Sequence, residues 1–189
     1  SDASILIVPG FGNSGPDHWQ TRWEQKLSTA HRVRQPDWHR ADRAQWAGAI
    51  AEAVNAAEKP VVLVTHSIGT AAVPHAAPMF APGKVIGGFL VGLSDWNREE
   101  LLPGVPHDFA PLPREPFSFP SLLVASRNDP YCDFEVAADH ANAWGSALVD
   151  AGEEAVELSQ LRCVRHRFGT EFLRAAGCER AMAGRVALA

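Results

Sequence analysis

A buried strand that runs directly into a helix, with a serine at the junction, is the most constraining feature of this sequence. Residues 61–64 are four consecutive β-formers, which is typical of a strand covered on both faces. The turn that follows, Thr65-His-Ser-Ile-Gly69, matches the G-x-S-x-G pattern except that Thr65 replaces its first glycine. Such a turn lifts a serine hydroxyl out of the backbone, so Ser67 is expected to be a nucleophile.

The rest of the chain alternates apolar runs with segments of helical period, which predicts a mostly parallel sheet with helices on both faces. Asp42 is expected to cap a helix that ends near Glu58, with Gln45 closing a capping box. A second helix is expected over 134–144, and the proline-rich residues 95–120 form a loop across the sheet edge. Strands are expected at 4–9, 32–35, 60–65, 85–92, 121–126 and 146–151.

Composition excludes several classes of function. The 189 residues are 46% hydrophobic and carry a net charge of −5, with no long basic run. This balance is ordinary for one globular domain, here residues 1–189, and gives no electrostatic support for binding nucleic acid or an anionic membrane. A small neutral organic substrate fits better, and no metal or organic cofactor is expected.

The cysteines and the N-terminal residues bear on location. The three cysteines, at positions 132, 163 and 178, have neither C-x-x-C nor metal-ligand spacing, which favours reduced thiols. The first ten residues lack the basic start and the long apolar run of a secretion signal. We therefore expect a cytoplasmic protein.

A serine nucleophile requires an acid, a base and oxyanion donors. Asp129 follows a predicted buried strand at the same sheet edge as Ser67, so it is the candidate acid, although Asn-Asp-Pro is also a common turn. Backbone N–H groups of Ile68 and of the Phe11–Gly12 region, in a loop with three glycines, are the candidate oxyanion donors.

Two further side chains are candidates for the substrate pocket. His18 follows the glycine loop, where it lines the pocket or simply begins a helix, and Trp96 lies at a strand edge facing the site. His66 is expected to pack beside the turn and to point away from the Ser67 hydroxyl. His140 is expected to be a core histidine with satisfied hydrogen bonds.

Three motifs together resemble a known family. They are Pro9-Gly-Phe-Gly-Asn-Ser-Gly-Pro-Asp-His-Trp-Gln20, Thr65-His-Ser-Ile-Gly69 and Ser126-Arg-Asn-Asp-Pro-Tyr131. In this order they resemble the small serine hydrolases related to retinoblastoma-binding protein nine and the bacterial YdeN-type proteins, over roughly residues 4 to 152. The resemblance implies an α/β-hydrolase fold without a cap domain, with Ser67 as nucleophile and Asp129 as acid.

The third member of the triad departs from that family. Where the family has a Gly-His after its last core strand, this chain continues Glu153-Glu-Ala-Val-Glu-Leu-Ser159, and the next histidine is His166. The last 37 residues also contain six arginines but no proline or tryptophan, which makes 153–189 atypical. Three explanations remain open: a longer loop that returns His166 to the site, a shifted reading frame, or a protein that has lost its base.

These observations predict a serine hydrolase, carboxylesterase-like, that cleaves small ester or amide substrates through an acyl-enzyme on Ser67. Its catalytic residues would be Ser67, Asp129 and His166. The alternative is a non-catalytic domain of hydrolase fold that has an incomplete triad and binds a protein partner.

Overall fold

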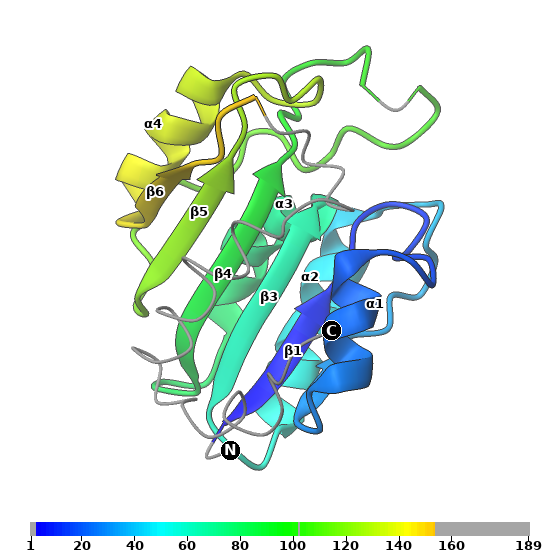
Figure 1. Ribbon diagram of the computed structural model, residues 1–189, viewed down its shortest axis with the longest axis vertical. Helices are drawn as coiled ribbons and strands as arrows, with labels where there is room; N and C mark the ends of the chain where they lie inside the picture. Colours follow the sequence, from blue (N-terminus) through cyan, green and yellow to red (C-terminus); the bar gives the residue numbers. More distant parts are fainter. Residues whose placement is uncertain (1–2, 102, 154–189) are drawn as a thin grey trace, which may run out of the picture.

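A single parallel sheet organises the part of the chain that the computed structural model describes, residues 3–101 and 103–153. Its six strands lie in the order β2-β1-β3-β4-β5-β6, and every neighbouring pair is parallel. Figure 1 shows the arrows of β1, β3, β4 and β5 pointing in the same direction, so their carboxyl ends lie along one edge of the sheet. The strands are β1 (Ser4–Val8), β2 (Ala30–Arg32), β3 (Val61–Ser67), β4 (Val85–Leu93), β5 (Ser121–Ala125) and β6 (Ala147–Asp150).

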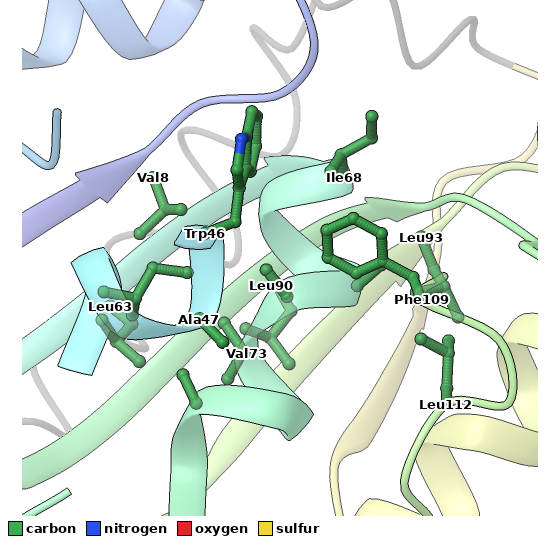
Figure 2. Close-up of a cluster of buried hydrophobic side chains, with 14 of the residues drawn as sticks. Val8, Trp46, Ala47, Leu63, Ile68, Val73, Leu90, Leu93, Phe109 and Leu112 are labelled. Carbon is green, nitrogen blue, oxygen red and sulfur yellow. The ribbon is translucent and has the colours of Figure 1, made fainter. Parts of the chain in front are cut away.

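Helices cover both faces of the sheet. The hydrophobic core consists of two clusters. One contains residues of α2, α3 and α4, and the other contains Trp19 of α1. Figure 2 shows part of the first cluster, where Trp46 and Ala47 of α2 lie near Val73 of α3 and strand residues. The helices are α1 (Trp19–Lys26), α2 (Arg43–Ala56), α3 (Ile68–Ala76) and α4 (Phe134–Trp144), with a short 3₁₀ turn, η1 (Ala77–Met79).

The order of elements and the parallel sheet confirm the predicted α/β class. β3 is central, and its residues 61–65 are fully buried, as expected for a run of β-formers between two helical layers. β2 is displaced by two residues from its predicted start and spans three residues, because its position is set by pairing with β1, Ile5 opposite Ala30. None of the described helices is long and apolar enough to cross a membrane.

The expected helix caps are largely confirmed. Asp42 caps α2 by accepting the N–H of Gln45 at 2.8 Å. The reciprocal half of the capping box was predicted wrongly, because the Asp42 N–H is donated to the Arg40 carbonyl. Gly145 ends α4 in the left-handed conformation that favours glycine.

Between β4 and β5 the described residues contain no helix or strand, which confirms the predicted loop. Phe109 and Leu112 of this loop are buried in the same cluster as α2 and α3 (Figure 2). The carboxylate of Asp108 accepts the first N–H of α2, from Arg43, at 3.1 Å, and His75 of α3 pairs with the Phe109 carbonyl at 2.9 Å. The loop is therefore fastened to two helices beside the carboxyl edge of the sheet.

Candidate active site

Ser67 occupies a strained turn between β3 and α3. Its backbone angles are φ 53° and ψ −123°, and among the described residues only Asn13 shares a positive φ without being glycine. The pairing of β3 with β4 shifts register between His66 and Ser67, so the strand departs from the ladder there. A residue with a side chain adopts such angles at a cost of about 1–3 kcal/mol and is held in place by its surroundings. This is the geometry expected of a nucleophile turn.

Gly69 lets α3 approach the end of β1. A Cβ atom at this position would lie 2.5 Å from the Val8 carbonyl oxygen and 2.6 Å from that of Pro9. Real Cβ atoms do not approach backbone oxygens so closely, and neither carbonyl belongs to a movable side chain. The second glycine of the G-x-S-x-G pattern is thus required by packing.

Gly10, in the loop after β1, leaves room for the Ser67 side chain. A Cβ at position 10 would lie 2.9 Å from the Ser67 Cβ and 3.5 Å from its Oγ. The loop after β1 therefore passes against the serine itself. Phe11, the candidate oxyanion donor, is the next residue along this loop.

Thr65 fills the place of the missing first glycine with a hydrogen bond. Its hydroxyl lies 2.7 Å from that of Thr70 in α3, and Thr70 donates to the Val91 carbonyl of β4 at 3.1 Å. Both side chains are fully buried. The substitution that weakened the sequence match thus joins β3, α3 and β4 directly behind Ser67.

Within the described part of the chain, two of the three predicted oxyanion residues have a backbone N–H with no acceptor. The N–H of Ile68 is the first of α3, where a helix has no internal acceptor and its dipole favours negative charge. The Phe11 N–H likewise has no acceptor among the hydrogen bonds of the described residues.

Gly12 has a different role from the one predicted. Its N–H is donated to the Trp38 carbonyl at 2.8 Å, so it is not available to an oxyanion. Gly12 lies in a turn from Gly10 to Asn13, which is closed by the Asn13 N–H donating to the Gly10 carbonyl at 3.2 Å. Its φ is 71°. A β-turn of this kind places Gly at its third position.

Asp129 lies just beyond the carboxyl end of β5, at the same edge as Ser67. One carboxylate oxygen accepts the Tyr131 N–H at 2.8 Å, which is the turn contact that Asn-Asp-Pro predicts. Burial raises the pKa of Asp129, and the Tyr131 N–H partly opposes that shift. A half-buried carboxylate without a cationic partner among the described residues is suited to receive an imidazolium.

The end of β6 is fastened to the Asp129 turn. The Arg127 N–H is donated to the Gly152 carbonyl at 2.7 Å, and the Ser126 hydroxyl reaches the same oxygen at 3.0 Å. Glu153, the last residue described, accepts from the Asn128 side chain and so lies beside the turn that carries the candidate acid. His166 and the three explanations for it lie outside the described residues.

His18 and His66 form a pair beside the turn. His18 caps α1 by accepting the Gln20 N–H on Nδ1 at 3.2 Å, and its ring lies 4.9 Å from that of His66. Burial lowers the pKa of His18 to about 4, with a smaller contribution from Arg32. Burial also lowers the pKa of His66 to about 3, with a smaller contribution from His18. Both rings are therefore neutral at physiological pH.

Trp96 is packed into the core instead of facing the site. Its side chain is 4% exposed, its indole N–H is donated to the Ser94 hydroxyl at 3.1 Å, and its ring contacts Phe109 and His107. A side chain so enclosed has little surface to offer a substrate. It anchors the loop between β4 and β5.

Other predicted residues have structural surroundings. His140 is buried against Trp144 as expected, but its Nδ1 has no hydrogen-bond partner among residues 3–101 and 103–153, so the predicted hydrogen bonds of this ring are not found in that part of the chain. Burial, with nearby aspartates, raises the pKa of the Cys132 thiol to about 12, so this cysteine is no nucleophile. Among the described residues, no group of three potential ligands could hold a metal ion.

Comparison with known proteins places this geometry in a family. The family model described as serine hydrolase matches residues 5–156. No curated protein matches the chain. Predicted membership of the small serine hydrolases is confirmed, whereas the specific relation to retinoblastoma-binding protein nine stays a prediction.

Solved structures agree with this result. A YdeN-like hydrolase from Pectobacterium atrosepticum is 31% identical, with a TM-score of 0.74 over 95% of this chain and 91% of that one. The YdeN protein of Bacillus subtilis is 18% identical, with a TM-score of 0.58 over 79% of this chain and 84% of that one. An esterase domain from Rhodothermus marinus is 19% identical, with a TM-score of 0.62 over 84% and 80%. The chain therefore belongs to the serine hydrolase family and has the α/β-hydrolase fold.

Proposed function

We propose that the protein is a single-domain, carboxylesterase-like hydrolase that cleaves small ester or amide substrates through an acyl-enzyme on Ser67. The observation that carries this proposal is the strained turn at Ser67, enclosed by Gly10 and Gly69. The Ser67 conformation costs free energy, and its surroundings leave no space for a side chain at Gly10 or Gly69. Presentation of the Ser67 hydroxyl to a substrate explains why such a conformation is kept. The similarity to an esterase domain supports the same class of reaction.

The proposed mechanism assigns one task to each group. The Ser67 hydroxyl attacks the substrate carbonyl carbon while a base accepts its proton, and the carbonyl oxygen becomes an oxyanion. The N–H groups of Phe11 and Ile68 stabilise that charge. The base then gives its proton to the leaving alcohol or amine, and water, activated by the same base, releases the acid and restores Ser67.

His166 is proposed as the base and Asp129 as its partner. A carboxylate whose pKa is raised by burial gains most from pairing with an imidazolium, which forms when the base holds the serine proton. Asp129 then orients the ring and stabilises its charge. His18 remains the proposed polar contact to substrate, because its Nδ1 is engaged with Gln20 and a neutral ring then carries its proton on Nε2.

We also propose a cytoplasmic location, since the cysteine spacing suits reduced thiols and Cys132 is a buried free thiol. Small-molecule esters or amides are the proposed substrates, without a nucleic-acid or membrane partner. A protein partner becomes the principal alternative if the site is incomplete.

Hydrolysis of p-nitrophenyl acetate tests the proposal. Ser67→Ala is expected to lower kcat by at least about 10⁴-fold, and Asp129→Asn by about 10²–10⁴-fold, with KM little changed. His166→Ala is expected to match Ser67→Ala. Full activity in His166→Ala with loss in Ser67→Ala would remove His166 from the mechanism but keep the hydrolase. Inactive, correctly massed and folded wild type would favour the non-catalytic interaction domain.

A further inference from the structure

The loop that carries Phe11 has an unusual backbone held by side chains. Gly12 and Asn13 both have positive φ, 71° and 68°, and Asn13 is not a glycine. This loop contributes one of the two proposed oxyanion donors, so its conformation fixes the direction of the Phe11 N–H. Asparagine tolerates this conformation better than most residues, and the Asn13 Oδ1 accepts the Ser14 N–H at 2.8 Å within the loop and a second donor from outside it.

Arg32, at the end of β2, provides that second donor. Its Nη1 donates to the Asn13 Oδ1 at 2.7 Å and to the Ser14 carbonyl at 2.9 Å. Its Nη2 donates to the Thr21 hydroxyl at 2.7 Å, while Nε donates to the Glu24 carboxylate at 2.9 Å. The side chain is 14% exposed, and Nη2 also lies 2.7 Å from Glu24. The guanidinium thus joins the loop to helix α1.

The backbone of Arg32 is fixed by its pairing with β1 in the sheet. Arg32 pairs with Ile7 of β1 in the sheet, and the next residue, Val33, donates its N–H to the Ile7 carbonyl at 2.9 Å. β1 leads directly into the loop, so the guanidinium is anchored to the strand from which Phe11 departs. A lysine at this position would supply charge but no fork of fixed donors.

Gln20 holds the same loop from the interior. It is fully buried, and its amide nitrogen donates to the carbonyls of Val8 and Val64 at 3.1 Å each. Its oxygen accepts the Ser14 hydroxyl at 2.7 Å. Ser14 is therefore bound through its carbonyl by Arg32 and through its side chain by Gln20, which is tied to the strand of the Ser67 turn.

We propose that Arg32 is a positioning residue that sets the Phe11 N–H against the oxyanion, acting through Asn13 and Ser14. This inference rests on the proposed function, because it assigns Arg32 a part in the same reaction. Arg32 stabilises the transition state without contacting the substrate. Its loss therefore lowers kcat and leaves KM nearly unchanged.

The test compares substitutions in the clamp, which is the set of hydrogen bonds from Arg32 to Asn13 and Ser14, with a control substitution at another arginine. Arg32→Lys, Arg32→Gln and Asn13→Ala remove the fork or its acceptor, whereas Asn13→Asp keeps an acceptor oxygen. Arg22→Gln is the control, because Arg22 lies on α1 in a loose exposed pair with Asp17 at 3.8 Å. For each, kcat and KM are measured with p-nitrophenyl acetate and its thionoester, whose sulfur accepts hydrogen bonds weakly. Hydrogen exchange of residues 10–14 and the thermal midpoint are measured alongside.

The expected result is a loss of about tenfold or more in kcat for the ester, smaller than the roughly 10²–10³-fold loss of a whole oxyanion donor. KM changes less than about twofold, and the thionoester rate falls much less than the ester rate, since it relies little on the oxyanion donors. Exchange of residues 10–14 accelerates, Asn13→Asp recovers the ester rate, and Arg22→Gln behaves as wild type.

Equal losses for both substrates, in step with a lower thermal midpoint, would overturn the proposal and leave Arg32 a structural residue. So would unchanged kinetics with unchanged exchange. If wild type hydrolyses neither substrate, the proposed function fails, and with it the part assigned to Arg32 in catalysis. Exchange of residues 10–14 would then decide separately whether the clamp itself exists.

Discussion

The two segments that meet at Ser67 are stabilised in opposite ways. The turn from β3 into α3 is held by close main-chain packing, with Gly69 against two carbonyls and buried hydroxyls behind it. The loop from β1 into α1 lacks regular structure and is held by side chains, chiefly Arg32 and Gln20. We infer that the nucleophile is fixed by main-chain packing in the core of the fold, whereas the conformation of the oxyanion loop depends on side chains outside it, the partly buried Arg32 and the fully buried Gln20.

Substitution of Gly69 should give the largest effect. Gly69→Ala places a methyl group within 2.6 Å of two backbone oxygens, so α3 must move from β1. We expect the free energy of unfolding to fall by about 3 kcal/mol or more, or folding to fail. Chemical denaturation measures the change.

Gly48→Ala is the matched control for Gly69. Gly48 lies within α2, and a Cβ there meets nothing within 4 Å. Alanine should therefore stabilise the protein by about 0.5–1 kcal/mol through helix propensity. Equal effects at the two glycines would contradict the close-packed account of the Ser67 turn.

Substitution of Gly10 tests the contact between the two segments. Gly10→Ala introduces a Cβ 2.9 Å from that of Ser67, and the oxyanion loop is expected to yield. We predict a loss of about 10²-fold in kcat, because the serine and the oxyanion donor separate, with a smaller loss of stability than in Gly69→Ala. Steady-state kinetics and denaturation measure both.

Gly15→Ala serves as the control in the same loop, since a Cβ there meets nothing within 4 Å. It should retain activity. Loss of stability in Gly10→Ala as large as in Gly69→Ala would show that the loop is as rigid as the turn, which contradicts the comparison.

The buried pair of His18 and His66 should make the stability of the protein sensitive to acid. Because burial depresses the pKa of His18 to about 4 and that of His66 to about 3, the folded state binds fewer protons than the unfolded state below pH 6.5. Their stabilisation is present above pH 6.5 and is lost as pH falls through 6.5 toward 4. His18→Asn keeps a helix cap without titrating, so it should reduce that loss by about 1–2 kcal/mol, allowing for partial exposure of the ring.

Denaturation curves at pH 7 and pH 4.5 measure this difference. The fall in the free energy of unfolding from pH 7 to pH 4.5 is expected to be larger for wild type than for His18→Asn. Parallel losses in the two proteins would refute the assignment of the acid sensitivity to this pair.

The hydroxyl pair behind Ser67 gives the smallest expected effect. Thr65→Val removes one buried hydroxyl while Thr70 keeps its bond to Val91, so we expect a cost of about 1 kcal/mol. Thr70→Val leaves the Val91 carbonyl without this donor and the buried Thr65 hydroxyl without its acceptor, so it should cost more. Thermal and chemical denaturation measure the loss of stability in each variant. A larger loss in Thr65→Val than in Thr70→Val would contradict the assignment of Thr70 as the donor to Val91.

The sequence predicted the fold well where local pattern and burial agree. The β-formers of residues 61–64 and the apolar runs of β4 and β5 are covered on both faces, so hydrophobicity alone marks them. β2 was displaced because a three-residue edge strand is positioned by its neighbour instead of by its own pattern. The capping residues predicted the start of α2 at Asp42 and the end of α4 at Gly145. The capping box did not form in full, because the Asp42 N–H is donated to a backbone carbonyl.

The site was predictable in proportion to how local its chemistry is. Ser67, its turn and Asp129 follow from short motifs, and Gly12 was misassigned because a positive φ and an open donor look alike in sequence. Gln20 ends the first motif but was given no role, and Arg32 went unnoticed, since their partners lie up to 44 residues away. Buried side-chain networks of this kind emerge only when the sheet brings distant segments together.

The most direct test of the central claim is covalent labelling by a fluorophosphonate probe, with intact mass and peptide mapping of wild type, Ser67→Ala and His166→Ala. We expect one adduct per wild-type chain on the peptide containing Ser67, with none in Ser67→Ala and little in His166→Ala. A folded wild-type chain of the expected mass that takes up no label, or takes it up elsewhere, would contradict the proposal that Ser67 is the nucleophile.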